Sequence, residues 1–490
     1  MLGQREYQNS FHFVNTYFYC FFKHRIRLKM IKTPNFKWIG VCAYAILITF
    51  SILFFVERVG FMDLSFHLFC IIKDGDFAIQ NNRFIAFFTQ LFPLLSSKAG
   101  FGLPVVMKLY SASFIILNFT CFIILAFVLK SWRYGVIMVL LNVLMVTHTF
   151  FWAQSELQQG LPVLVLYFGL IEYYLKLEDR SIKYHAVQVA IQVLLLVLVF
   201  AHPVIFIPAI FLYIFYMFQD KLNRTYYGMN LAVFIAFLGI KTVFFNTAYD
   251  TQAGGSALNL LTFFPNYFMH QSNYNFIRYV INDYYFLILG ALAIGVFYVR
   301  FKRWFELLLS GGFFLAYLLL VNMSYPGGEH QFYLENLYLP LTIFVAFPLV
   351  YDLLPKLKVS HAGYLFVLVV IIRLADIYYT HTFYEERVDY LYGVIDDVKS
   401  DSNSKVVLKE RESDKEALMM TWAVPYEVWV LSTYRDQESA SIILTPNVDE
   451  KSYIQQYSTK FSATWGDFEY NSLPEQYFVF KDNSNYVIRQ

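Results

Sequence analysis

The chain of 490 residues is 58% hydrophobic and 20% aromatic but only 15% charged, and its mean hydropathy is +0.47. This composition excludes soluble globular, disordered and collagen-like proteins, and four cysteines in a chain of this length exclude a disulfide scaffold. A polytopic membrane protein remains. The net charge of +2 conceals an asymmetry, because residues 381–490 carry 11 Lys and Arg against 19 Asp and Glu, whereas the remainder carries 27 against 17.

Apolar runs that could cross a bilayer occur eleven times. A transmembrane helix needs about 20 mostly apolar residues. We therefore predict a mainly α-helical, polytopic transmembrane bundle over residues 38–379. His202 and Pro203 separate the fifth run from the sixth, so these are either two spans or one kinked helix. The predicted spans are 38–56, 104–129, 135–152, 160–175, 186–201, 203–218, 228–246, 284–299, 305–321, 337–354 and 360–379.

Basic residues recur in every second loop of this predicted bundle. Six Lys and Arg lie between residues 23 and 37, and further basic residues follow the second, fourth, sixth, eighth and tenth spans. Because cytoplasmic loops are enriched in Lys and Arg, we predict a basic cytoplasmic segment at 1–37 and an extracytoplasmic C-terminus. Residues 1–29 are either an amphipathic arm or a segment upstream of the natural start at Met30. Short loops and few glycosylation sequons favour a bacterial inner membrane.

Three predicted external segments are longer than a turn requires: the first loop, 57–103, a later loop, 247–283, and the tail from 380. The tail, 380–490, contains a predicted helix at 384–399 and a helical stretch at 414–433. Short β-branched or aromatic runs alternate with these and predict strands. We therefore predict a small extracytoplasmic α/β domain, with strands at 405–408, 441–444 and 477–480.

Acidic residues follow the first predicted span and open the second external loop. Glu57 and Asp63 lie just after the first span, and Glu156 is the lone carboxylate of the second loop. An acid at the membrane surface can act on a lipid-linked substrate. The alternatives are that Glu57 is an interfacial anchor, that Asp63 caps the helix beginning at Leu64, and that Glu156 is solvated.

This layout resembles the GT-C class of integral-membrane glycosyltransferases, which includes protein mannosyltransferases, lipid A aminoarabinose transferases and the oligosaccharyltransferase catalytic subunit. The shared features are a cytoplasmic N-terminus, a long first external loop with an acid near its start, a second acid in the next external loop, and an external C-terminal domain. The resemblance implies catalytic roles for Asp63 (or Glu57) and Glu156. The chain lacks an adjacent Asp-Glu pair after the first span and a Trp-Trp-Asp signature in its tail.

A sugar on a polyprenyl phosphate needs cations to hold its phosphate. Candidates near the outer ends of predicted spans are Lys241, Arg278, His330 and Arg373. A charge within a span costs about 2.5–3.5 kcal/mol, which favours a function for Lys241 and Arg373. The alternatives are that Lys241 extends to the interface and that Arg373 pairs with Asp376.

The fifth predicted external loop is rich in polar side chains that could engage a sugar or a phosphate. Glu329, His330 and Tyr333 belong to it, and Gly327-Gly328 would allow close approach. Tyr333 fits equally well in a membrane aromatic belt. His202, at the external end of the fifth span, is a further candidate, although a lone histidine there is more often a packing residue.

Other sites are weakly indicated. The sequence has no Walker A motif, dinucleotide fingerprint, His-Glu-x-x-His or Cys-x-x-Cys, and nothing indicates a nucleic-acid partner. No cofactor is certain, although Asp63 with Glu156 could hold a divalent cation such as Mg²⁺ or Mn²⁺.

The leading hypothesis is transfer of a sugar from a polyprenyl-phosphate donor to a lipid, glycan or protein acceptor at the outer face of the membrane. The first alternative is a transporter or flippase of a lipid-linked or small polar substrate, which would place charges at mid-membrane depth. The second is an assembly protein that binds a partner through its acidic tail. The predicted spans have few charges at their centres, which favours the transferase.

Overall fold

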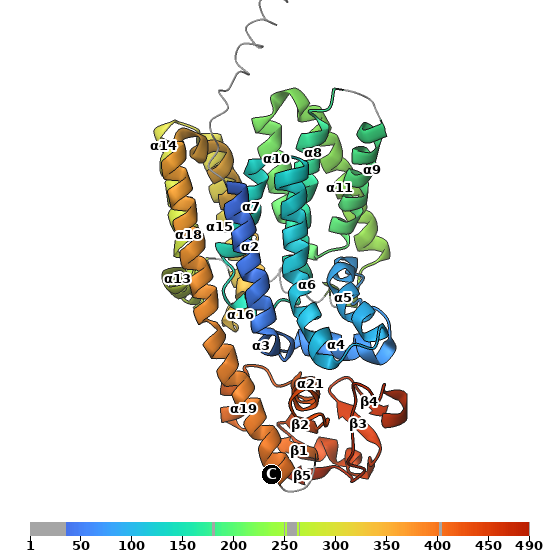
Figure 1. The fold of residues 1–490 in the computed structure, drawn as a ribbon. Coiled ribbons are helices and arrows are strands. Elements are labelled where there is room, and N and C mark those ends of the chain that lie inside the picture. The colour runs from blue at the N-terminus through green and yellow to red at the C-terminus, as the bar shows by residue number, and fades with distance from the viewer. Residues whose placement is uncertain are drawn as a thin grey trace, which may run out of the picture.

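The computed structural model describes residues 36–178, 182–248, 250–251, 262–263, 265–400 and 404–489. Nearly all of the predicted basic segment 1–37 lies outside these residues. The described part is mainly helical, with a bundle of long helices and a smaller C-terminal region at one end of it (Figure 1). Residues between these two parts form short helices that run across the end of the bundle.

The described helices that run along the bundle are eight to 21 residues long. They are α2 (Phe36–Leu53), α6 (Leu103–Ile123), α7 (Trp132–Val143), α8 (Glu156–Tyr174), α9 (Ile182–Val199), α10 (Phe206–Gln219), α11 (Arg224–Phe244), α14 (Tyr285–Arg300), α15 (Trp304–Ser324), α17 (Leu341–Pro348) and α18 (Val359–Tyr379). Further helices, of five to 12 residues, lie toward the end that faces the C-terminal region: α3 (Phe55–Val59), α4 (Asp63–Asp74), α5 (Phe87–Lys98), α13 (Gln271–Asn282) and α16 (Gln331–Tyr338) (Figure 1).

Six helices of the described part are long and apolar enough to cross a membrane, and there are up to eight if two bent helix pairs each count as one span. Two further apolar helices, Trp132–Val143 and Pro203–Gln219, are shorter. The prediction that several helices could span a membrane is confirmed. The predicted number of eleven spans stays a prediction. The residues around His202-Pro203 separate α9 from α10, so the fifth and sixth predicted runs are two helices.

The loops that carry the basic residues lie at the end of the bundle opposite the C-terminal region (Figure 1). Arg303 forms an ion pair with Asp352 at 2.7 Å, and the Gln219 side chain donates to the same carboxylate at 2.9 Å. Arg133 lies over the Tyr351 ring. These contacts bring three of the basic loops to the same segment, around Tyr351 and Asp352. The basic loops therefore lie at one end of the bundle and the loops between them at the other.

The C-terminal region begins as a continuation of α18 into α19 (His381–Ser400). Three parallel strands follow in the order β2-β1-β5, and two antiparallel strands, β3 and β4, pair separately. The predicted strands at 405–408 and 441–444 are β1 and β2. The strand bounds are β1 (Lys405–Lys409), β2 (Ser441–Thr445), β3 (Lys460–Ala463), β4 (Gly466–Glu469) and β5 (Val487–Arg489).

Of the predictions for the tail, one strand is wrong and one helical stretch is correct except for a break. Residues 477–480 are not a strand; their backbone is irregular, and Phe478 and Phe480 stack on the rings of Trp429 and Tyr470. The helical stretch 414–433 is broken at Met419, whose φ of 62° ends one helix. The two helices are α20 (Glu412–Leu418) and α21 (Val424–Asp436).

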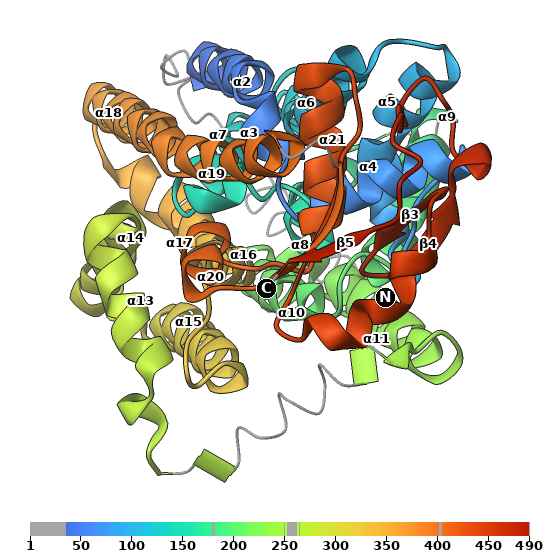
Figure 2. The same ribbon diagram turned by 90° about the horizontal axis from the view of Figure 1, so that it is seen from below.

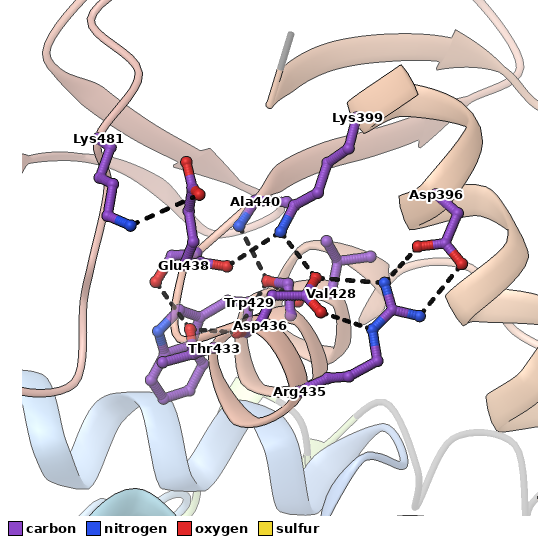
Figure 3. A network of polar contacts seen from close by, with 12 residues as sticks. Asp396, Lys399, Val428, Trp429, Thr433, Arg435, Asp436, Glu438, Ala440 and Lys481 are labelled. Atoms are coloured by element: carbon purple, nitrogen blue, oxygen red, sulfur yellow. Dashed lines mark hydrogen bonds and ion pairs between the residues drawn. The ribbon is translucent and has the colours of Figure 1, made fainter. Parts of the chain in front are cut away.

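Helix α21 joins the C-terminal region to the bundle. On one side, ion pairs connect it to α19: Arg435 with Asp396, and Lys399 with Asp436 at 2.8 Å (Figure 3). On the other side it packs against α4, where Phe69 contacts Trp429. Figure 2 shows α19 and α21 lying across the end of the bundle. Phe66 and Phe69 of α4 also contact Tyr426 of α21, so they lie on the α4 face that makes this contact.

Candidate functional site

A cavity of about 660 Å³ lies where α4, the segment before α8, α16 and the C-terminal region meet. The residues that line this cavity therefore come from segments that are hundreds of residues apart in the sequence. Four of the candidate residues line it: Asp63, Glu156, His202 and Tyr333. The other lining residues are Met62, Phe66, His67, Gln80, Asn81, Arg83, Trp152, Gln154, Ser155, Phe332, Asn336, Leu337, Met420, Trp422 and Trp465.

Asp63 is the first residue of α4 and lies against an aromatic wall. The Trp152 indole Nε1–H donates to Asp63 Oδ2 at 2.7 Å, and the Trp152 ring packs against Phe332 and Tyr333. Burial raises the pKa of Asp63 to about 7, and repulsion from Glu156 adds to the shift while the indole hydrogen bond opposes it. A carboxyl group with this pKa is present in both protonation states at neutral pH, as a general acid or base requires.

Glu156, the first residue of α8, lies in a different environment. Its carboxylate forms an ion pair with Arg83 at 3.1 Å, and the same guanidinium pairs with Asp250 at 3.1 Å. All three side chains are largely buried. The cavity thus holds two carboxyl groups, one against an indole and one against a guanidinium, and such differences in environment assign different roles to paired carboxylates.

The backbone just before Asp63 is strained. Met62 has φ 43° and ψ −114°, a backbone conformation that residues other than glycine rarely adopt. Its N–H donates to Glu427 Oε1 of α21 at 2.6 Å, and Glu427 forms a fully buried ion pair with Arg387 of α19 at 2.7 Å. Arg387 also donates to the Gly60 carbonyl at 3.4 Å. The C-terminal region therefore holds the turn that orients Asp63.

His202 and Lys241 lie near Arg83. The pKa of His202 is well below its usual value, first because of burial and second because of repulsion from Arg83 and Lys241, so its ring is neutral. Its Nδ1 accepts a hydrogen bond from the Val204 N–H at 3.3 Å. Lys241 is buried over the Phe200 ring and is not among the residues that line the cavity.

Arg373 does not reach the cavity, and its guanidinium binds protein groups instead. It donates to the carbonyls of Val143 at 2.7 Å and Val146 at 3.2 Å, and it forms an ion pair with Asp376 at 2.7 Å. Asp376 is the partner that the alternative prediction gave to Arg373, and the structure contains this ion pair. Because the side chain is completely buried among these groups, its position fits a link between helices and gives no support to phosphate binding.

The remaining candidates lie elsewhere. Arg278, Glu329 and His330 line a separate, open cavity of about 440 Å³. His330 also contributes to a third cavity of about 730 Å³ next to α20. Glu57 is half-buried in α3 beside α19, where desolvation raises its pKa, and its Oε2 has no hydrogen-bond partner among the described residues.

Glu335 of α16 supports the segment that carries Trp152. Its buried carboxylate accepts hydrogen bonds from the backbone N–H groups of Thr147, His148 and Thr149 at 2.6–3.1 Å, and from the Tyr284 hydroxyl at 2.8 Å. These bonds fix the turn that leads from α7 to the cavity wall.

We expect Glu335→Gln to lower the free energy of unfolding by about 1–3 kcal/mol, because an amide NH₂ would face backbone donors in a buried site. Denaturant titration of the detergent-solubilised protein measures this. Glu329→Gln, at an exposed position of the neighbouring loop, is the matched control and should change stability by less than about 0.5 kcal/mol. Equal stability of the two variants would contradict the role of Glu335.

Within the described ranges, no group of three or more His, Cys, Asp and Glu side chains lies close enough to hold a metal ion. The carboxylate of Glu156 is already paired with Arg83. The residues present therefore do not form the divalent-cation site considered for Asp63 with Glu156, and we derive no step through a metal.

Several residues of this site were not among the candidates. Arg83 was not predicted as a site residue, because the sequence does not show that it contacts Glu156, which lies 73 residues further along the chain. Trp422 and Trp465 come from the C-terminal region, and Glu427 acts through Met62. Only the position of Arg83, in a turn of the loop that contains Asp63, could have indicated it.

Comparison of the chain with models of known protein families, with curated proteins and with solved structures found no match in any of the three.

Proposed function

We propose that the protein transfers a sugar from a polyprenyl-phosphate donor to a hydroxyl-bearing acceptor at the outer face of a membrane. The observation that carries this proposal is Asp63: a half-buried carboxyl group with a pKa of about 7 in a cavity of about 660 Å³. Helices α4 and α16, which line the cavity, lie at the end of the bundle near the C-terminal region (Figure 1). By the distribution of Lys and Arg this is the outer end.

In the proposed step, Asp63 in its ionised form accepts the proton of the acceptor hydroxyl. The acceptor oxygen forms a bond to the anomeric carbon of the sugar, and the bond from that carbon to the phosphate oxygen breaks. The phosphate leaves with the electron pair as polyprenyl phosphate. Asp63 then releases its proton to water. Arg83, held by Glu156 and Asp250, is the cation on the cavity wall that would face the phosphate.

The aromatic walls of the cavity support a sugar as the occupant. Trp152, Tyr333 and Phe66 line it from the bundle side, and Trp422 and Trp465 line it from the C-terminal region. Aromatic faces pack against the C–H faces of sugar rings. The volume accommodates one or two sugar units, within the usual range for ligand sites.

The experiment is reconstitution of the full chain into lipid vesicles with a panel of sugar-linked polyprenyl phosphates and membrane lipid acceptors. The readout is release of free polyprenyl phosphate. We expect release that depends on the sugar donor. Movement of intact donor between leaflets without cleavage would overturn the proposal and favour the flippase.

The rate should depend on pH through Asp63. Because the base must be ionised, we expect kcat/KM for the donor to rise with pH, with a midpoint near pH 7. The same shift predicts that stability falls as pH rises from 3.8 to about 7, because the folded chain retains a proton that the unfolded chain loses. A pH–rate profile between pH 5 and 9 tests the first expectation, and a flat profile would contradict the role of Asp63.

A further inference from the structure

A histidine of α4 shares the cavity with Asp63. His67 lies four residues after Asp63 in the same helix, so the two side chains are neighbours on one helix face. Both line the cavity, and His67 is only 5% exposed. The proposed transfer step gives His67 no role. What its ring can do depends on which nitrogen carries the proton.

The amide of Gln90 in α5 identifies that nitrogen. The Ala78 N–H donates to Gln90 Oε1 at 2.8 Å, and Gln90 Nε2 donates to the Ala78 carbonyl at 3.1 Å. A backbone N–H can only donate and a carbonyl oxygen can only accept, so these two contacts fix the orientation of the amide. Gln90 Nε2 also lies 3.3 Å from His67 Nδ1. Because the Gln90 NH₂ group is a donor, Nδ1 accepts this hydrogen bond and carries no proton.

The charge of the ring is set by its burial. The pKa of His67 is below its usual value, first because burial disfavours the charged form, while the Glu156 carboxylate and the Ala78 carbonyl oppose the shift. The ring is therefore neutral at neutral pH and holds a single proton. With Nδ1 unprotonated, that proton lies on Nε2.

The Nε2 edge of the ring is the one that a ligand can reach. Gln90 and Ala78, which lie at the Nδ1 edge, do not line the cavity, whereas His67 does. Nε2 makes no hydrogen bond to a residue that the structure describes, yet it is not one of the unpaired side-chain atoms without accessible surface. The N–H group at Nε2 is therefore accessible from the cavity.

We propose that His67 donates a hydrogen bond from its Nε2–H to an oxygen of the sugar donor bound in the cavity, an inference that rests on the proposed function. Hydroxyl and phosphate oxygens both accept such a bond. A neutral imidazole can polarise a substrate oxygen without adding a charge to the site. In this scheme His67 contacts the ligand, and Gln90 is a positioning residue that keeps the proton on Nε2.

The first measurement is nitrogen NMR of the full chain with isotope-labelled histidine in detergent micelles, because the Nδ1 and Nε2 resonances differ between the two tautomers. His67 is assigned from the signal that disappears in His67→Gln. We expect the Nε2–H tautomer in the wild-type chain and a shift of its Nε2 resonance when a donor analogue binds. An Nδ1–H tautomer, or an Nε2 resonance that the bound analogue does not move, would overturn the inference.

Two substitutions separate ligand binding from a purely structural role. Asparagine can keep an acceptor near the Nδ1 position for Gln90 but is too short to place a group at the Nε2 position, whereas glutamine can place an amide donor there. We therefore expect the Kd of a donor analogue to rise roughly threefold to tenfold in His67→Asn and to stay within about twofold in His67→Gln. If His67 only supported Gln90, His67→Gln would lower the unfolding midpoint and neither variant would change Kd.

Two probes identify the contacted oxygen: a non-cleavable phosphonate analogue of a hexose-linked polyprenyl phosphate, and the sugar-free polyprenyl phosphonate. A loss of affinity in His67→Asn for the hexose analogue alone assigns the oxygen to the sugar, and an equal loss for both assigns it to the phosphate. The matched control is His361→Asn. His361 is exposed at the start of α18 and does not line the cavity, so Kd should stay within about twofold of the wild-type value.

The outcomes separate this inference from the proposed function. If the vesicles cleave the donor while His67→Asn binds both probes as tightly as His361→Asn, the hydrogen bond from His67 is wrong and the transferase stands. If His67→Asn weakens binding but the vesicles move the donor without cleaving it, the transferase is wrong and the contact stands. If neither probe binds the wild-type chain, both are wrong. Unfolding midpoints identify a variant that fails to fold, and the NMR shift in the wild-type chain then decides.

Discussion

Replacement of Asp63 by Asn is expected to lower sugar transfer by roughly 10²–10⁴-fold, the usual contribution of a general base. Asparagine keeps the shape of the side chain and can still accept the hydrogen bond that Trp152 donates at 2.7 Å. It cannot take up a proton from the acceptor hydroxyl. The change should therefore reduce kcat with little effect on the Kd of a non-cleavable donor analogue, because binding does not require proton transfer.

The control for Asp63→Asn lies on the same helix. Asp74 ends α4, its side chain is 54% exposed and its partner is Lys73, so Asp74→Asn should leave transfer unchanged. Both variants should unfold at the wild-type midpoint or above it at neutral pH, because Asp63→Asn removes a carboxyl group whose ionisation the folded state disfavours. Full activity of Asp63→Asn would contradict the assignment of this residue as the base.

The sequence anticipated the parts of this site that follow from local position. The sequence predicts Asp63 and Glu156 as site residues because each lies just beyond an apolar run, and both line the same cavity. Helix ends at one side of a bundle are close in space whatever their separation in the chain. The same reasoning selected Arg373, but depth within a helix does not reveal which groups surround a side chain. Its guanidinium binds the carbonyls of Val143 and Val146.

The parts that could not be predicted depend on packing between distant segments. Arg83 meets Glu156 and Asp250 only because the first loop folds back over the end of α8. Trp422 and Trp465 reach the cavity only because α21 packs against α4. In the tail, β1 and β2 followed from their β-branched residues. The aromatic run 477–480 was misleading, because aromatic side chains can fill a core from irregular backbone as well as from a strand.

Substitution in the ion pair between Arg387 and Glu427 is expected to have the second large effect, a loss of stability. Both side chains are almost completely buried, and Glu427 also accepts the N–H of strained Met62. Glu427→Gln removes one charge and leaves the other buried, which should lower the free energy of unfolding by about 3–5 kcal/mol. Denaturant titration followed by tryptophan fluorescence measures the loss, because Trp429 lies in the same helix.

A less buried ion pair between the same two helices provides the comparison. Lys399 and Asp436 also join α19 to α21, but their side chains are 24% and 27% exposed (Figure 3). Lys399→Met should therefore cost at most about 1 kcal/mol. A cost for Glu427→Gln no larger than that of Lys399→Met would show that the buried pair does not stabilise the junction.

The double variant Arg387→Met with Glu427→Leu separates stability from positioning. Removing both charges of a buried pair is often neutral or stabilising, so this variant should recover most of the stability lost in Glu427→Gln. It should not recover transfer, because the Met62 N–H loses its acceptor at 2.6 Å and the strained turn before Asp63 is free to relax. Because the pair acts through Met62, the loss should fall on kcat more than on donor Kd. A stable double variant with full activity would mean that the turn keeps its conformation without the C-terminal region.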